Sequence, residues 1–188
     1  MTSQVNGLSK KYKTIVIDFP WLLGNFLKDK FPRTINYKMM NDDEVRNFPL
    51  LDFADNDCGL FMWVTMGKVP LGLELLQKWG FKYHLIITWH KSNMLNFLGF
   101  GRNSELIIFV YRGKFNVNTG EGSYIPTCFK GKNKKHSQKP DEFYEILRAR
   151  TPEPRIDIFA RRRHYGFDAY GDQIEQEIQI PITESFSN

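Results

Sequence analysis

Four consecutive residues, Asp18, Phe19, Pro20 and Trp21, place a carboxylate, a ring, a rigid backbone and an indole directly after an apolar run. The run lies within "KTIVIDF", residues 13–19, a segment that is rich in β-branched residues and predicts a strand buried on both faces. An acid at the end of a strand often caps a helix, but ligands of open α/β sheets also bind at these strand ends. We therefore treat the quartet as a candidate site and ask what else the chain brings to it.

Two other predicted strands end in unusual polar sequences. "WHKSN" closes the strand at 83–91, and "RRRH" follows the strand at 154–160. Each could be an ordinary solvated turn. Because the carboxyl ends of parallel strands meet at one edge of a sheet, three such ends together favour a binding site.

Strands alternate with helices along the chain, which predicts an α/β fold with a mostly parallel, doubly wound sheet. We predict one domain over residues 12–178, with polar tails at 1–11 and 179–188, and functional loops at 92–104 and 114–138. Strands are expected at 13–19, 58–65, 83–91, 104–114, 154–160 and 166–173, and helices at 41–49, 69–81 and 139–151.

The composition favours a polyanionic partner molecule. The 188 residues carry a net charge of +5 and the pI is about 9.1, which suits a polyanion such as nucleic acid. Two cysteines and four histidines are scattered without metal-ligand spacing, so we expect free thiols and no metal. Without an apolar run of membrane-spanning length or a signal peptide, we expect no membrane association and a cytoplasmic, nucleoid or nuclear location.

Glycine-rich nucleotide motifs do not explain the chain. "GFGRNSE" at 99–105 begins like a dinucleotide-binding loop, but Ser104 stands where the third glycine is needed and a strand follows instead of a helix. No phosphate-binding loop of the P-loop type occurs.

An ordered set of motifs gives the chain a family resemblance. "DFPW", "YKMMNDDEV", "GLFMWVT", "LLQKWGF", "ITWHKSN", "SELIIFVYRGK", "HSQKPDEFYEIL" and "IDIFARRRHYGFDAYGDQI" follow one another over residues 13–175. In this the chain resembles the MT-A70-like adenine methyltransferases, whose hallmark is D-P-P-W. The resemblance implies a circularly permuted Rossmann-like methyltransferase fold, in which the catalytic motif precedes the cofactor strand. It also implies methyl transfer from S-adenosylmethionine to the exocyclic N6 amine of adenine in nucleic acid.

Site residues follow from the same resemblance. The catalytic group is Asp18, the Phe19 carbonyl, Pro20 and Trp21, which together would hold the amine in line and stack on the base. Tyr37, Lys91 and Glu105 are expected on the substrate side. The resemblance assigns the following to the cofactor, with Lys139 on its carboxylate and Asp18 near its amine: Asp18, Lys139, Asp157, Phe159, Arg161, Arg163, His164, Asp172 and Gln173.

Some features depart from the family pattern and leave alternatives open. Phe19 replaces the first proline of the hallmark, and Arg163 stands where some members have histidine. A compact chain without an RNA-binding module favours DNA as the substrate, with RNA as the alternative. A further alternative is a non-catalytic nucleic-acid-binding subunit, and a homodimer or a related partner subunit is compatible with either.

Overall fold

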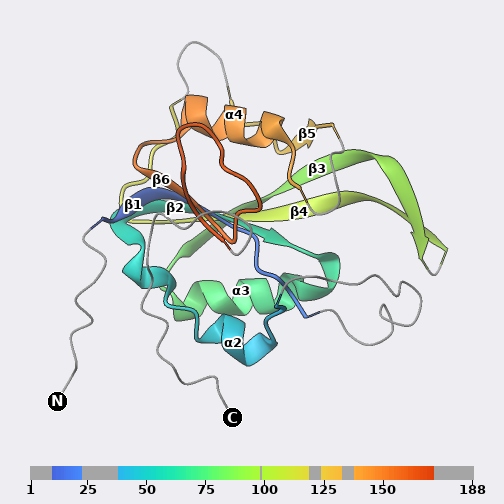
Figure 1. Ribbon diagram of the computed structural model, residues 1–188, viewed down its shortest axis with the longest axis horizontal. Coiled ribbons are helices and arrows are strands. Elements are labelled where there is room, and N and C mark those ends of the chain that lie inside the picture. Colours follow the sequence, from blue (N-terminus) through green and yellow to red (C-terminus); the bar gives the residue numbers. More distant parts are fainter. Residues whose placement is uncertain (1–9, 23–37, 98, 119–123, 133–137, 172–188) are drawn as a thin grey trace.

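A seven-stranded mixed sheet forms the centre of the computed structural model, which describes residues 10–22, 38–97, 99–118, 124–132 and 138–171 (Figure 1). The strand order is β5-β3-β4-β2-β1-β6-β7, and only β4 runs against the others. This confirms the predicted α/β, mostly parallel sheet. The strands are β1 (Tyr12–Ile17), β2 (Ala54–Val64), β3 (Lys82–Phe97), β4 (Phe100–Arg112), β5 (Cys128–Lys130), β6 (Arg155–Ile158) and β7 (Asp168–Tyr170).

Helices cover both faces of the sheet. Figure 1 shows α2 (Asp42–Arg46) and α3 (Val69–Lys78) on one side and α4 (Asp141–Arg150) on the other. As predicted, Leu71, Leu75 and Trp79 are buried on the inner side of α3. Gly80 follows that helix with φ +69°, the left-handed conformation that ends many helices. Within the described residues, no helix is long and apolar enough to cross a membrane.

The central strand β1 carries the candidate quartet. It pairs in parallel with β2 on one side and β6 on the other, so Val16 lies between Phe61 and Asp157. Its apolar residues are fully buried because both faces are covered by helices. Asp18 is therefore delivered to the carboxyl edge of the sheet, where its backbone N–H donates to the Ile158 carbonyl at 3.3 Å.

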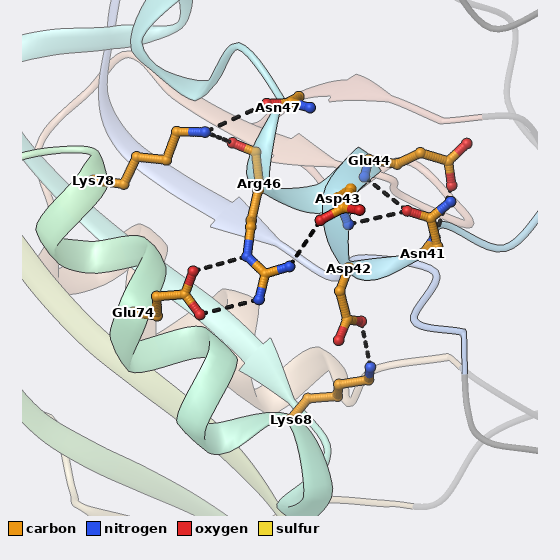
Figure 2. Close-up of polar contacts among 9 residues, drawn as sticks. All are labelled: Asn41, Asp42, Asp43, Glu44, Arg46, Asn47, Lys68, Glu74 and Lys78. Atoms are coloured by element: carbon orange, nitrogen blue, oxygen red, sulfur yellow. Dashed lines mark hydrogen bonds and ion pairs between the residues drawn. The ribbon is translucent and has the colours of Figure 1, made fainter.

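An ion pair between α2 and α3, called the clamp below, holds α2 in place, and the residues just before α2 pair with the turn after β1. Figure 2 shows Arg46 of α2 bonded through two nitrogens to the Glu74 carboxylate of α3, at 2.8 and 3.1 Å. As predicted, Asn41 caps α2, and its side chain accepts from Asp43 and Glu44 N–H while Glu44 accepts from the Asn41 N–H. The residue before this cap, Met40, is thereby fixed where it pairs with the turn after β1.

The prediction of a loop at residues 92–104 is wrong, because most of these residues lie in strands. β3 continues to Phe97 and β4 begins at Phe100, so the two strands form one long antiparallel hairpin. Asn, Ser and Gly weaken the strand signal there because this end lies beyond the core and needs no apolar face. The loop predicted at 114–138 likewise contains the short strand β5, which pairs with β3 from Thr88 to His90.

Candidate active site

Asp18 belongs to a network of four charged side chains in which acids and lysines alternate. The Lys139 ammonium lies 3.1 Å from Oδ2 of Asp18 and 3.0 Å from Oε2 of Glu105. The other Glu105 oxygen pairs with Lys91. Lys139 is only 14% exposed, and its Nζ lies 4.7 Å from the centre of the Trp63 ring. The structure thus brings three predicted residues, Asp18, Glu105 and Lys139, into direct contact.

The sheet explains why residues so distant in sequence meet. Asp18 follows the end of β1, and Glu105 lies near the start of β4, opposite Trp89 of β3. Because β4 runs against its neighbours, its beginning lies at the same edge as the carboxyl ends of the parallel strands. Lys139 reaches this edge from the segment just before α4.

Burial and pairing set the charge states of the network. Burial raises the pKa of Asp18, the negative charge of Glu105 adds to this, and Lys139 and Arg161 oppose it only in part. Burial also disfavours ionised Glu105, but Lys139 and Lys91 outweigh it and lower the pKa of Glu105. Burial likewise opposes the charge of Lys139, yet attraction to Asp18 and Glu105 prevails and raises the pKa of Lys139. Lys139 therefore stays a cation between two acids.

The turn from Phe19 to Trp21 is held from within the core. The Phe19 carbonyl accepts the Trp21 N–H at 2.8 Å, and the Pro20 carbonyl accepts the Met40 N–H at 2.8 Å. Phe19 is buried, and its ring packs on Trp21, Phe48, Trp79 and Phe159 at centroid distances of 5.1 to 6.2 Å. Aromatic packing thus supports the turn at the position where the family hallmark has proline.

Trp21 differs from the expectation of an open stacking face. Its ring is only 6% exposed, and its Nε1 donates to the Trp63 carbonyl at 3.3 Å. In this structure the indole anchors the turn, because the backbone pairing with Met40 draws it into the core. Stacking on a base stays a prediction.

The end of β6 turns sharply beside Asp18. Phe159 has φ +62°, a left-handed conformation that is uncommon for a bulky residue and that concentrates at functional sites. Two residues later, Arg161 lies close enough to act electrostatically on Asp18. The predicted cofactor segment therefore lies next to the predicted catalytic acid.

Asp157 lies inside the sheet, on β6, and is only 3% exposed. Its Oδ2 accepts the Tyr144 hydroxyl of α4 at 2.9 Å. Burial raises the pKa of Asp157 to about 8, since the hydrogen bond from Tyr144 only partly offsets burial and the charge of Asp18 adds to it. The Tyr144 ring also stacks on His164, with 3.3 Å between centroids.

Of the remaining predicted site residues, two lie in the described part of the chain and three do not. Lys91, expected on the substrate side, pairs with Glu105 and lies over the Trp89 ring. Arg163 is exposed beside the buried side chain of His164. Tyr37, Asp172 and Gln173 lie outside the described residues.

Sequence reasoning missed two residues of this region. Tyr144 lies in the predicted helix at 139–151 and has no predicted role. A buried tyrosine hydroxyl needs a partner, and a buried acid on a neighbouring strand is a signal that could have identified the pair. Trp63 is fully buried at the end of β2, and its indole N–H has no acceptor among the described residues. No pattern in the sequence marks that unsatisfied donor.

These groups define what the arrangement can do. Asp18 and the Phe19 carbonyl provide oxygen acceptors beside each other, suited to a planar amine. Lys139 provides a cation for a carboxylate, and the N–H of Trp63 provides a buried donor in the ring that Lys139 covers. Asp18 is an acid that suits an ammonium group.

Comparison with known proteins places the chain in a family. The MT-A70 family model matches residues 12–173. The chain belongs to the MT-A70 family. The resemblance inferred from the ordered motifs is thereby confirmed.

Relatives of this MT-A70 chain carry methyltransferase names. It is 32% identical over 151 residues to the N(6)-adenosine-methyltransferase MT-A70-like of Arabidopsis thaliana, covering 73% of this chain and 21% of that protein. It is 28% identical over 163 residues to the N(6)-adenosine-methyltransferase catalytic subunit METTL3 of Homo sapiens, covering 80% and 26%. It is 26% identical over 192 residues to the type II methyltransferase M.MunI of Mycoplasma sp, covering 92% and 82%. The chain thus spans about a fifth of the plant relative and a quarter of the human relative, but most of M.MunI.

Proposed function

We propose that this MT-A70 chain transfers a methyl group from S-adenosylmethionine to the exocyclic N6 amine of adenine in a nucleic acid. The observation that carries the proposal is the Asp18–Lys139–Glu105 network at the carboxyl edge of the sheet. The names of the relatives add support, since those from Arabidopsis thaliana and Homo sapiens are called N(6)-adenosine-methyltransferases.

The residues fit the amino-acid end of the cofactor. Lys139 would bind its carboxylate, Asp18 would face its ammonium group, and Asp157 would lie near the pocket. The unsatisfied N–H of Trp63 supports a ligand that brings an acceptor to this edge. The bound cofactor would supply an electrophilic methyl group on a sulfonium centre. Asp172 and Gln173, expected at its ribose and adenine, lie outside the described residues.

The chain's own task is to orient and activate a poor nucleophile. The lone pair of the adenine amine is delocalised into the ring, so the N–H groups must be held by acceptors that favour a tetrahedral nitrogen. Asp18 and the Phe19 carbonyl are suited to accept these hydrogens. The carboxylate of Asp18 would also stabilise positive charge that develops on the nitrogen as the N–C bond forms and the S–C bond breaks. The nitrogen then releases one proton, and the product is a neutral secondary amine.

Labelled cofactor and matched DNA and RNA oligonucleotides that contain adenine test the proposal. DNA is the first substrate to try, and the RNA partner decides between the two. Replacing Asp18 by asparagine keeps the shape but removes the charge, and should lower kcat by about 100- to 1,000-fold. The same substitution at exposed Asp52 is the matched control.

Direct binding measurements separate the cofactor assignment from turnover. Lys139→Met should weaken cofactor binding in calorimetry by roughly 10- to 150-fold, the range for one lost charged hydrogen bond. Undiminished binding would remove Lys139 from the cofactor site. If the parent chain transfers no methyl group to either oligonucleotide, the non-catalytic binding subunit becomes the better description.

A further inference from the structure

The outer part of the β3–β4 hairpin extends past the catalytic network. Glu105 pairs with Trp89, and the two strands then continue to Phe97 and Phe100. Figure 1 shows this end projecting well beyond the rest of the sheet. Phe100 lies five positions before Glu105 on β4, which at about 3.4 Å per position corresponds to roughly 17 Å. The hairpin therefore overhangs the edge at which the proposed substrate must arrive.

Large apolar side chains are exposed at this projecting end. Phe100 is 75% exposed and Met94 is 67% exposed. The Met94 side chain lies against Gly101, where a β-carbon would meet its sulfur. Since alternate residues of a strand share a face, Met94 lies on the face of β4 that carries Glu105, and Phe100 lies on the other face with Arg102. The hairpin end thus presents apolar contacts on both faces.

A local irregularity in β3 produces this arrangement. Between His90 and Leu95, β3 advances five residues while β4 advances only two, from Ser104 to Arg102. Such a bulge redirects side chains and is frequent beside active sites. It begins at Lys91, the residue that pairs with Glu105.

The charges around the hairpin suit a polyanion. Residues 82–104 contain no acid. Arg102 is exposed on β4, and Lys130 is exposed on β5 opposite His90 of β3. Glu105, at the inner end, is already paired with two lysines. Exposed apolar or aromatic side chains next to cations are the combination with which proteins contact bases and phosphates together.

We propose that Met94 and Phe100 bind bases that flank the target adenine, while Arg102 and Lys130 contact the phosphates of the same strand. This inference rests on the proposed function, because it takes nucleic acid as the substrate. A distance of roughly 17 Å corresponds to about five stacked nucleotides at 3.4 Å each. The hairpin end therefore contacts the substrate at a distance from the methylated base.

The test uses the doubly substituted chain, Met94→Ala with Phe100→Ala, and adenine oligonucleotides of two lengths. Flanks of about two nucleotides are too short to reach the hairpin end, and flanks of about ten nucleotides pass it. The KM for the long oligonucleotide should rise roughly 5- to 150-fold, the loss expected for one stacked base. Cofactor binding, kcat and the KM for the short oligonucleotide should not change.

Tyr83→Ala provides a matched control. Tyr83 is 53% exposed on the same strand, β3, but near its first residue and so at the opposite edge of the sheet. Its removal should leave the KM for both oligonucleotides unchanged.

Three results would overturn the inference. One is an unchanged KM for the long oligonucleotide; another is an equal rise for both lengths. The third is a change in oligomeric state by sedimentation without nucleic acid, which would make the hairpin end a protein interface. If the parent chain methylates nothing, the proposed function fails first, and fluorescence anisotropy with the long oligonucleotide still tests the hairpin directly.

Discussion

Replacing Asp157 by asparagine should make the chain more stable, and increasingly so as the pH rises. The folded chain holds this carboxyl with a pKa of about 8, against an ordinary value of 3.8. Between these values the folded chain keeps a proton that the unfolded chain releases. The free energy of unfolding of the parent therefore falls as pH rises through this window, by up to about 1.4 kcal/mol per pH unit.

The substitution isolates that contribution because asparagine cannot ionise. Its side-chain oxygen can still accept the Tyr144 hydroxyl, which the parent bonds at 2.9 Å. From pH 5 to pH 7, the advantage of the variant should grow by about 2–3 kcal/mol. Well below pH 3.8, where both states of the parent hold the proton, the pH-dependent part of the advantage should vanish.

Urea unfolding at pH 4, 5, 6 and 7, at constant ionic strength, measures the difference. Asp52→Asn makes the same chemical change on the surface and serves as the control. A stability difference that stays constant from pH 4 to pH 7 would refute the reasoning, because Asp157 would then ionise equally in both states. A difference that shrinks with pH would show that the carboxylate is stabilised by the fold.

Three further substitutions follow from the described contacts. Lys139→Met should destabilise the chain by about 3–5 kcal/mol, because it leaves two acids without their shared cation. In urea unfolding, adding Glu105→Gln should recover part of this loss. No recovery would mean that Lys139 stabilises the chain by packing. Asn41→Ala should cost about 1 kcal/mol of stability by removing the cap of α2, with kcat unchanged; a loss of kcat would show that the clamp reaches the catalytic turn. Phe19→Pro restores the family hallmark but removes a buried ring. Thermal unfolding should therefore show a free energy of unfolding lower by roughly 3 kcal/mol. An equally stable variant would show that aromatic packing does not support the turn.

The parts of the fold with a strong local signal could be predicted from the sequence. The buried run before Asp18, the cap at Asn41 and the inner face of α3 are each specified by neighbouring residues, and all three are confirmed. The network of Asp18, Lys139 and Glu105 has no local signal. The family resemblance named its members, but only the antiparallel direction of β4 explains why Glu105 lies beside Asp18.

Other features could not be predicted because they depend on tertiary contacts. The bond between Tyr144 and Asp157 joins a helix to a strand, and each residue alone fits an ordinary pattern. The outer hairpin lies beyond the core, so it lacks the alternation of polar and apolar residues by which strands are recognised. Trp21 is buried where its backbone pairs with Met40, and no spacing in the sequence predicts that pairing.

The alternating network of Asp18, Lys139, Glu105 and Lys91 also affects how a substrate reaches the chain. Two unpaired acids at this edge would repel the phosphates of an approaching nucleic acid, whereas two acids paired with two lysines carry no net charge. The long-range field then comes from the remainder of the chain, whose net charge is +5. Association with a polyanion should accordingly be fast at low salt and slow down as ions screen that excess. Under the proposed function, the chain keeps carboxylates at this edge of the sheet without slowing the arrival of a nucleic acid.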